Sequence, residues 1–438
     1  MMAKKCSLIL PVAFFLINVF TQLFAETEDE QADTPDFSYE RGFYESPIEV
    51  VLSTNTENAE ISFTLDASSP TETHGERYKA PITIKTTTVL RAIATKPGMR
   101  SSKIRTNTYI FADSVLVQHN QPAGYPATWA GHTADYEMDP DVVTGHESEL
   151  KTGLKAIPII SIVTDRHHLF GAEGIYVNSQ QSGREWERPT SVELIYPDGT
   201  EGFHENCGLR IHGGASRQPD QSPKHGFRFY FRDEYGPTRL RYDLFGGDAT
   251  DEFDQLVLRS GYNNTWIHGN HVGSENQRGQ ALYVRDQWMR DTQLAMGHLS
   301  AHGMFVHLYL NGMYWGLFNL TERPEGAFAA SYLGGDEKDF DTTNAGDFLN
   351  GDSKVWNLAL DIAAGDMSEP QSYKMMQEFI NIDNFIDYII LNHYAGNHDW
   401  DHHNWYGFRK RAKGWGFRFV SWDAEHVLED AQKNKKSN

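Results

Sequence analysis

The chain contains very little cysteine: its 438 residues include only Cys6 and Cys207. Two cysteines are too few for the disulfide framework that holds small secreted domains together. The fold must therefore depend on buried apolar cores, and the chain is long enough for two or three domains that each have one.

Positive charge is also scarce, because 39 Lys and Arg residues face 60 Asp and Glu, a formal net charge of −21. Nucleic-acid binding needs clustered cations that displace counterions from phosphates, so this composition argues against a nucleic-acid partner. Hydrophobic residues make up 39% of the chain and charged residues 23%. These proportions are typical of a globular protein and exclude a largely disordered one.

Long apolar runs are missing except at the N-terminus. Lys4 and Lys5 precede an interrupted apolar run at 8–24, which leads through Ala25 into an acidic stretch. This order is typical of a secretory signal peptide, and the run is too short and too interrupted for a membrane anchor. We expect residues 1–25 to be removed and the mature protein, with no membrane span, to be secreted, periplasmic or at the cell surface.

Aromatic residues are abundant, at 13%, and favour β-rich structure. After an acidic linker at 26–36, residues 37–112 contain short strand patterns separated by turns. Residues 61–65, for example, alternate as a half-buried strand does, and 96–98 read Lys-Pro-Gly. Strands at this spacing predict a small β-sandwich.

Several motifs in this region match a known domain; among them are Phe63-Thr64-Leu65-Asp66, Tyr78-Lys79-Ala80-Pro81-Ile82 and Thr88-Val89-Leu90-Arg91-Ala92. The stretch resembles the chitobiase/β-hexosaminidase C-terminal-like domain. The resemblance implies an all-β, immunoglobulin-like accessory module of exported proteins. Two roles stay open for it: contact with carbohydrate or cell wall, or a spacer.

The rest of the chain divides into a connector and a larger domain. Residues 113–155 are rich in Pro and Gly and predict a loop-rich connector that marks a boundary or wraps around the periphery. Residues 156–438 change from a β-rich half to a helical half. We therefore expect a multidomain chain, all-β first and α+β second.

Particular elements of the larger domain can be placed from its pattern. A hairpin is predicted over Asn311-Gly312, which separates two apolar runs. A strand is predicted at 174–178 among several others. Helical spacing of apolar residues predicts helices at 284–296, 373–380 and 385–394. Asp383 is the expected N-cap of the last helix.

The most informative window is 383–425. A predicted helix leads into a polar segment that contains Asp399 and Asn404, and an aromatic hairpin follows and ends at Asp423. Strands rich in Trp, Phe and Tyr do not need acids at their ends in order to fold. The hairpin therefore predicts that three oxygen ligands meet in one small volume.

Phosphoryl transfer needs such a group of oxygens. One carboxylate orients or accepts the proton of the attacking hydroxyl, while a second carboxylate and an amide hold Mg²⁺ beside the phosphates. Protein kinases place an Asn five residues after the catalytic Asp and a metal-binding Asp after the next hairpin. Here Asn404 follows Asp399 at that spacing, and Asp423 follows the hairpin.

Ordered motifs from Ile157 onward match one family; they include Leu209-Arg210-Ile211-His212-Gly213-Gly214, Leu258-Arg259-Ser260-Gly261, Tyr283-Val284-Arg285-Asp286-Gln287 and Trp422-Asp423. This part resembles the spore coat protein H (CotH) kinase family. The resemblance implies an atypical protein-kinase-like fold, a β-rich lobe followed by a helical lobe. It also implies binding of ATP with Mg²⁺ or Mn²⁺ and phosphorylation of Ser or Thr on a protein substrate.

The resemblance implies roles for seven residues. Asp399 is the expected catalytic base, and Asn404 and Asp423 are the expected metal ligands. Four more are expected to bind the nucleotide: Lys224 and Arg210 at the phosphates, Asp286 paired with one of those cations, and Glu322 at a hinge beside adenine. Family members continue through more helix beyond the equivalent of Asn438, so we expect the helical half to be incomplete.

Two alternatives remain open. Histidines and aspartates gather at 398–403, so a metal-dependent hydrolase is one rival. The simpler interpretation of these histidines is hydrogen bonding to the site or loop surface, because no helical zinc motif is present. Export also places the protein where ATP is scarce. The other alternative is therefore a noncatalytic surface module with a kinase-like fold that binds glycan or wall protein.

Overall fold

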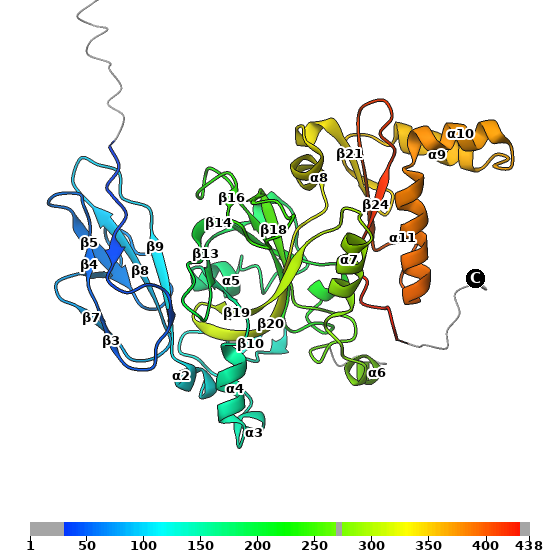
Figure 1. The fold of residues 1–438 in the computed structure, drawn as a ribbon. Helices are drawn as coiled ribbons and strands as arrows, with labels where there is room; N and C mark the ends of the chain where they lie inside the picture. The colour runs from blue at the N-terminus through cyan, green and yellow to red at the C-terminus, as the bar shows by residue number, and fades with distance from the viewer. Residues whose placement is uncertain (1–29, 269–273, 430–438) are drawn as a thin grey trace, which may run out of the picture.

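The computed structural model of the protein describes residues 30–268 and 274–429. The expected signal peptide at 1–25 lies outside the described residues. The chain has three parts: an N-terminal β-rich domain in blue to cyan, a β-barrel mainly in green, and a mixed α/β part mainly in yellow to red (Figure 1). The mixed α/β part also includes two green helices, α6 and α7, which are inserted between the barrel strands β18 and β19. Within the described ranges, no helix is both long enough and apolar enough to span a membrane.

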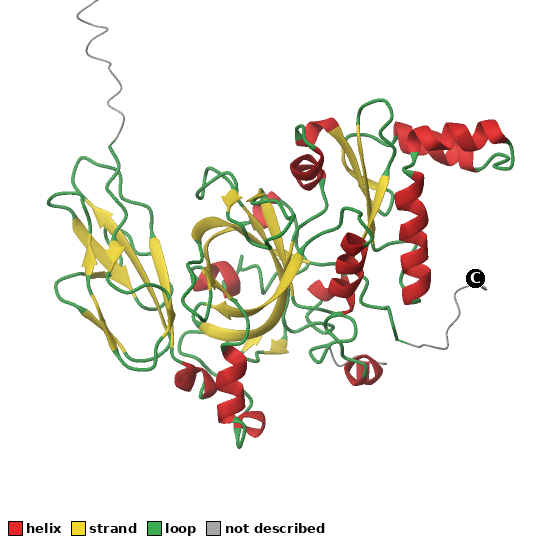
Figure 2. Ribbon diagram, viewed as in Figure 1, coloured by secondary structure: helices red, strands yellow, loops and turns green. Residues whose placement is uncertain are grey.

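The N-terminal domain is built from short strands, as the pattern predicts. A five-stranded sheet in the order β2-β9-β8-β5-β6 is accompanied by the pairs β3-β7 and β1-β4 (Figure 2). Alternation explains the core, since Ile48 and Val50 are buried while Glu49 points outward. The strands are β1 (Asp36–Phe37), β2 (Gly42–Phe43), β3 (Ile48–Val50), β4 (Leu52–Ser53), β5 (Glu60–Thr64), β6 (Glu76–Arg77), β7 (Ile82–Ile84), β8 (Thr88–Thr95) and β9 (Arg105–Ile110).

The connector at 113–155 is more structured than expected, because it carries short elements and packs on the barrel. Trp129 and Tyr136 are buried in the barrel's own hydrophobic core, which fits the interpretation of a peripheral wrap. Its elements are α2 (Ala112–Leu116), β10 (Thr128–Trp129), β11 (His132–Thr133), α3 (Pro140–Val143) and α4 (Glu147–Leu154).

Seven strands close a barrel in the order β12-β13-β14-β15-β18-β20-β19. The β12–β19 pair is parallel and closes the barrel, and the other neighbours are antiparallel. Every second side chain along a barrel strand points into the barrel core. In β14, Leu209 and Ile211 are buried while Arg210 between them is half-buried. The barrel strands are β12 (Ile159–Val163), β13 (Arg188–Ile195), β14 (His204–His212), β15 (Gly226–Tyr230), β18 (Gln255–Arg259), β19 (Gly303–Leu310) and β20 (Met313–Thr321).

The connections of the barrel confirm one local prediction and correct another. Asn311 and Gly312 join β19 to β20 with φ of 51° and 81°, the two left-handed positions of a tight hairpin. The strand expected at 174–178 is wrong, because these residues form turns. The smaller elements are α5 (Arg166–Phe170), η1 (Arg184–Trp186), η2 (Ala215–Arg217), β16 (Leu240–Arg241) and β17 (Glu252–Phe253).

The last part is mixed α/β and less purely helical than expected. A four-stranded sheet in the order β22-β21-β23-β24 includes two strands that the sequence pattern did not predict, β21 (Phe340–Asn344) and β22 (Asp347–Asn350). The remaining strands are β23 (Trp405–Lys410) and β24 (Arg418–Ser421), and the helices are α6 (Ser274–Gly279), α7 (Arg285–Ala295), α8 (Gly326–Leu333), η3 (Glu337–Asp339), α9 (Lys354–Ala363), α10 (Pro370–Phe379) and α11 (Ile382–Ala395).

The three predicted helices are confirmed as α7, α10 and α11, but the predicted cap of α11 is wrong. Asn381 is the N-cap, and its side chain accepts a hydrogen bond from the backbone N–H of Asn384. Asp383 lies in the first turn instead, where its negative charge still suits the helix dipole.

Candidate active site

A polar pocket of about 280 Å³ is lined by residues of the barrel and of the mixed α/β part. Four chain segments form most of it: the turn after β14, the segment after β18, the loop before β23 and the residues after β24. Its lining residues with a charged, imidazole or amide side chain are His212, Arg259, Asn263, Asp399, His403, Asn404, Asp423 and Glu425. The structure thus brings Asp399, Asn404 and Asp423 together, as the spacing predicts.

Asp399 is held by two neighbours in its own loop. The Asn404 side-chain amide donates to the Asp399 carboxylate at 2.9 Å and to its backbone carbonyl at 3.1 Å. The ring of His403 contacts the other carboxylate oxygen at 2.7 Å. About a third of the Asp399 side chain, 31%, stays exposed, so the carboxylate is oriented and still open to the pocket.

The backbone at both ends of the β23–β24 hairpin has unusual geometry. Helix α11 ends at Gly396 in the left-handed conformation, and Asn404 and Asp423 also have positive φ, at 64° and 57°. Non-glycine residues rarely adopt this conformation, and such positions concentrate at functional sites. The geometry turns both side chains into one pocket at the mouth of the hairpin.

Arg259, at the end of β18, is the cation of the pocket. Its guanidinium pairs with Asp423, with Glu425 at 2.9 Å and with Asp286 at 3.8 Å. It also lies over the ring of Trp422, 5.2 Å from the centroid. Arg259 has no role among the sequence predictions; its place in an Arg-Ser-Gly motif directly after an apolar strand was the available signal.

Asp286, from α7, supports the segment that carries Asp423. Its carboxylate accepts a hydrogen bond from the backbone N–H of Ala424 at 2.9 Å and pairs with Arg290 at 3.2 Å. Burial alone would raise its pKa, but Arg259 and Arg290 outweigh burial and lower the pKa. The expected pairing of Asp286 with Lys224 or Arg210 is therefore wrong: its partners are two other arginines.

Glu425 is a further acid that sequence reasoning did not assign to the site. It is buried, and its carboxylate accepts a hydrogen bond from the Asn263 backbone N–H at 2.7 Å. Burial and the neighbouring Asp423 raise its pKa, and Arg259 offsets part of that rise. Its position two residues after Asp423 in the hairpin's exit was visible in the sequence.

Lys224 and Arg210 are not among the described residues that line this pocket, and each has another partner. The Lys224 ammonium lies 5.1 Å from the centroid of Trp315, a barrel-core residue. The Arg210 guanidinium pairs with Glu187 at 2.7 Å. Their expected role at the phosphates stays a prediction that this geometry does not support.

Glu322 directly follows β20, on the connection between the barrel and the mixed α/β part. Its carboxylate accepts hydrogen bonds from the His302 backbone N–H and the Tyr332 hydroxyl, both at 2.8 Å. The side chain is buried and lies outside the described lining of the pocket, so contact with adenine stays a prediction.

The donor set of the pocket suits a hard divalent cation. Asp399, Asn404, Asp423 and Glu425 line the same pocket with carboxylate and amide oxygens, the ligand type that Mg²⁺ prefers. A second combination also exists, since ligand atoms of Asp399, His402 and His403 lie within 4.8 Å of one another. That set would suit a softer metal, but His402 is not among the described residues that line the pocket.

Comparison with known families identifies two regions of the chain. The chitobiase/beta-hexosaminidase C-terminal domain matches residues 39–106, and the CotH kinase protein family matches residues 209–438. The chain belongs to the CotH kinase family. It combines an N-terminal β-rich domain with a mixed α/β CotH region. Membership suggests an atypical kinase and implies the use of ATP. No curated protein matches the chain.

Proposed function

We propose that this CotH kinase family protein is an exported, metal-dependent protein kinase that transfers the γ-phosphate of ATP to a Ser or Thr hydroxyl of a protein. The observation that carries the proposal is the meeting of Asp399, Asn404, Asp423 and Arg259 around one pocket. An oriented carboxylate, an amide, a second carboxylate and a cation are the groups that phosphoryl transfer requires.

Asp399 acts as the base in this proposal. The substrate hydroxyl donates a hydrogen bond to the Asp399 carboxylate and gives up its proton there as its oxygen attacks the γ-phosphorus, and the bond from that phosphorus to the leaving ADP oxygen breaks. Asn404 and His403 hold the carboxylate in place throughout. Asn404 and Asp423 would hold Mg²⁺ or Mn²⁺, which supplies charge neutralisation of the phosphates when bound.

We assign the phosphate-facing cation to Arg259 in place of Lys224 or Arg210. Arg259 lines the pocket, is 10% exposed, and reaches Asp423 and the α7 residue Asp286. Protein kinases use a strand cation paired with a helix acid for the same purpose. A guanidinium also offers a planar fork of donors that suits phosphate oxygens.

The proposal includes a location and a surface partner. The N-terminal pattern at 1–25 supports export to the periplasm, the cell surface or the medium. The β-rich domain would then be an immunoglobulin-like module that contacts cell wall or glycan. The match to the chitobiase/beta-hexosaminidase C-terminal domain supports this role.

Transfer of ³²P from ATP to a protein acceptor tests the activity. Labelling should require Mg²⁺ or Mn²⁺ and should disappear in Asp399→Ala and Asp423→Ala. Asp361→Ala, which changes an exposed acid on α9, is the matched control and should label normally. Labelling that survives in both site variants would contradict the proposal.

Two measurements separate the alternatives. A noncatalytic surface module would bind no nucleotide, so calorimetric binding of ATP with Mg²⁺ counts against that function. A hydrolase that uses the cluster around Asp399 would depend on His402, whose side chain is 65% exposed and is not among the described residues lining the pocket. We expect His402→Ala to keep full phosphotransfer.

A further inference from the structure

Asp423 needs neighbours that fix its position. Its side chain is 41% exposed, and its backbone φ of 57° is a conformation that non-glycine residues rarely adopt. It also lies beyond β24, which ends at Ser421, so the pairing of β24 with β23 does not include it. The placement of its carboxylate therefore depends on contacts that the adjoining residues make.

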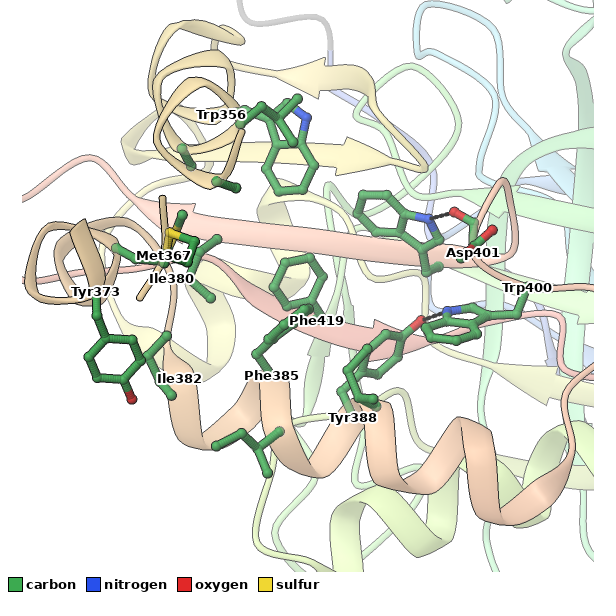
Figure 3. A pocket seen from close by; sticks show the side chains of 17 residues that line it. Trp356, Met367, Tyr373, Ile380, Ile382, Phe385, Tyr388, Trp400, Asp401 and Phe419 are labelled. Carbon is green, nitrogen blue, oxygen red and sulfur yellow. Dashed lines mark hydrogen bonds between the residues drawn. The ribbon is translucent and has the colours of Figure 1, made fainter. Parts of the chain in front are cut away.

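The other end of the hairpin shows how an adjoining residue can anchor such a segment. The Trp400 indole N–H, directly after Asp399, donates a hydrogen bond to the Tyr388 hydroxyl of α11 at 2.6 Å (Figure 3). Both rings line an apolar cavity of about 580 Å³ between α9, α10, α11 and the hairpin, and Phe419 of β24 lines it too. An aromatic neighbour thus ties the Asp399 loop to α11.

Trp422 is the corresponding neighbour of Asp423, on the opposite face of the hairpin. Side chains alternate along a strand, so Phe419 packs beside the cavity, whereas Val420 belongs to a separate hydrophobic cluster that also contains Trp422 and Tyr406. Trp422 is 5% exposed, and its ring lies edge-on to Tyr406 with 5.6 Å between the centroids. Because Trp422 directly precedes Asp423, whatever fixes this ring also restrains the carboxylate.

Two arginines contact the Trp422 ring. The guanidinium of Arg259 lies 5.2 Å from its centroid, and that of Arg323 lies 5.0 Å from it. Arg323 also lies 4.9 Å from the centroid of Tyr406. The attraction between a cation and an aromatic ring is stronger where water is excluded, and the Arg323 side chain is only 10% exposed. Arg323 therefore holds both rings.

Arg323 is itself held from the barrel. It follows the end of β20 by two residues, and its guanidinium pairs with Glu325 at 2.8 Å. Glu325 pairs in turn with Arg228 of the barrel strand β15 at 2.6 Å. A continuous series of contacts thus runs from the barrel through Glu325 and Arg323 to Trp422.

We propose that Arg323 is a positioning residue of the metal site, which holds the Trp422 ring and thereby keeps the Asp423 carboxylate in place to bind Mg²⁺ or Mn²⁺. Arg323 is not among the described residues that line the pocket, so it acts through Trp422 and touches neither phosphate nor metal. The inference rests on the proposed kinase function, in which Asp423 is a metal ligand. Groups that orient a metal ligand typically contribute about 10- to 100-fold to metal affinity.

The direction of the effect separates positioning from electrostatics. Arg323 is a cation close to the site, so the loss of its charge alone would make binding of a divalent cation tighter. The loss of positioning has the opposite effect, because Asp423 would no longer be held in the arrangement that binds the metal. Arg323→Met should therefore weaken metal binding even though it removes a positive charge.

Titration of the full-length protein with Mn²⁺ tests this, with free Mn²⁺ measured by electron paramagnetic resonance. Arg323→Met should weaken binding by about tenfold. Arg323→Lys keeps a cation that can lie over both rings and should bind Mn²⁺ more tightly than Arg323→Met. Glu325 keeps its pair with Arg228 in these variants, which favours folding. Arg323→Gln, which can still hydrogen-bond Glu325, repeats the test if Arg323→Met does not fold.

Arg409→Met is the matched control. Arg409 of β23 is 12% exposed, pairs with the buried carboxylate of Asp341 and lies 5.9 Å from the centroid of Phe417. It is not among the described residues that line the polar pocket. Its loss should destabilise the same hairpin without weakening Mn²⁺ binding. Unchanged or tighter binding in Arg323→Met, or an equal loss in Arg409→Met, would overturn the proposal.

A double substitution tests the route through Trp422. Trp422→Leu removes the ring and should itself weaken Mn²⁺ binding. Residues that act through one another have effects that do not add, so Arg323→Met should cause little further loss in the Trp422→Leu protein. Two losses that multiply would show that Arg323 acts by another route and would overturn the proposal.

Phosphotransfer kinetics keep this result separate from the kinase proposal. In Arg323→Met, the Mn²⁺ concentration for half-maximal labelling should rise about tenfold, while the rate at saturating Mn²⁺ stays near that of the parent. A lower rate with unchanged half-saturation would indicate a general structural defect and overturn the positioning role. A parent that binds Mn²⁺ but transfers no phosphate would contradict the kinase function, and the binding data would still decide the role of Arg323. A parent that binds no Mn²⁺ would overturn both.

Discussion

Asn404 has two roles in the proposed site: its amide nitrogen holds Asp399, and its amide oxygen would bind the metal. Asn404→Ala should therefore lower the rate of phosphotransfer by about 10²-fold, the usual cost of removing one preorganised group. Steady-state labelling with varied Mg²⁺ measures it. Asn357→Ala, on the exposed surface of α9, is the control, and an unchanged rate in Asn404→Ala would contradict the assignment.

Arg259 neutralises several acids at once, so its loss should affect stability as well as activity. In Arg259→Met, the buried Asp286 and Glu425 lose a shared counterion. We expect the free energy of unfolding to fall by about 3–5 kcal/mol. Arg241→Met removes an arginine that is 76% exposed and also pairs with an acid, and it should change stability by less than about 1 kcal/mol.

The unfolding of Arg259→Met and Arg241→Met in urea measures this difference. If the two variants were equally stable, the ion cluster at the pocket would contribute no more than a surface pair. Arg259→Lys keeps the charge but loses the guanidinium fork, so it should fall between Arg259→Met and the parent protein.

Glu325 gives the protein a predictable response to acid. Burial would raise its pKa, but Arg228 at 2.6 Å and Arg323 at 2.8 Å lower the pKa to about 2. Because the folded-state pKa is depressed below the ordinary 4.5, the stabilisation is complete above that value and is lost as the pH falls toward 2. The shift corresponds to about 3 kcal/mol at neutral pH.

Urea unfolding at several pH values tests this account. Glu325→Gln should be less stable than the parent at pH 7, and the difference should shrink steadily between pH 4.5 and pH 2. Glu369→Gln, at an exposed site, should follow the parent at every pH. A difference that does not change with pH would contradict the role of the carboxylate charge.

At the scale of elements, the turn of the β19–β20 hairpin, which the local sequence predicts, also contacts the N-terminal domain. Gly312 has φ of 81°, and a Cβ there would lie 3.2 Å from a Val89 methyl of the N-terminal domain. Gly312→Ala should therefore cost about 1–2 kcal/mol of the free energy of unfolding. Gly414 has a similar φ of 77° with open space around it, so Gly414→Ala isolates the backbone cost alone.

Thermal unfolding of the two alanine variants separates these effects. Gly312→Ala should be the less stable of the two, since it combines an unfavourable φ with a close contact. Equal stability of the two variants would show that Val89 can move away from the added methyl group at little cost, so that the contact between the hairpin and the N-terminal domain is not tightly packed.

Features that depend on residues close together in the chain could be predicted from the sequence, whereas features that depend on contacts between distant segments could not. The Asn311-Gly312 turn, helix α7 and the Asp399, Asn404 and Asp423 spacing depend on neighbours in the chain, so the pattern shows them. The pairing of β21 with β23 and the parallel closure of the barrel by β12 and β19 join distant segments. Arg259 meets Asp423 across 164 residues, which no local pattern records.

At the scale of the whole molecule, the N-terminal domain and the barrel share a buried polar contact. Glu193 of β13 is fully buried, and it accepts a hydrogen bond from the Thr108 backbone N–H of β9 at 3.1 Å. The Thr108 hydroxyl also bonds the Glu193 carboxylate and the Ser161 hydroxyl. Such a network is costly to separate, because each buried polar group would lose its partner.

The N-terminal domain and the barrel should consequently unfold together, and a substitution that destabilises one should lower the stability of the other. Thr108→Val keeps the shape of the side chain but removes a donor to buried Glu193, at a cost of about 1–3 kcal/mol.

Between residues 30 and 128 the sequence has no tryptophan, so tryptophan fluorescence reports on the barrel and the mixed α/β part. Thr108→Val should lower the urea midpoint of that fluorescence transition, whereas Thr83→Val, outward-facing on β7, should leave it in place. A fluorescence transition unmoved by Thr108→Val would show that the N-terminal domain is an independent unit beside the kinase region.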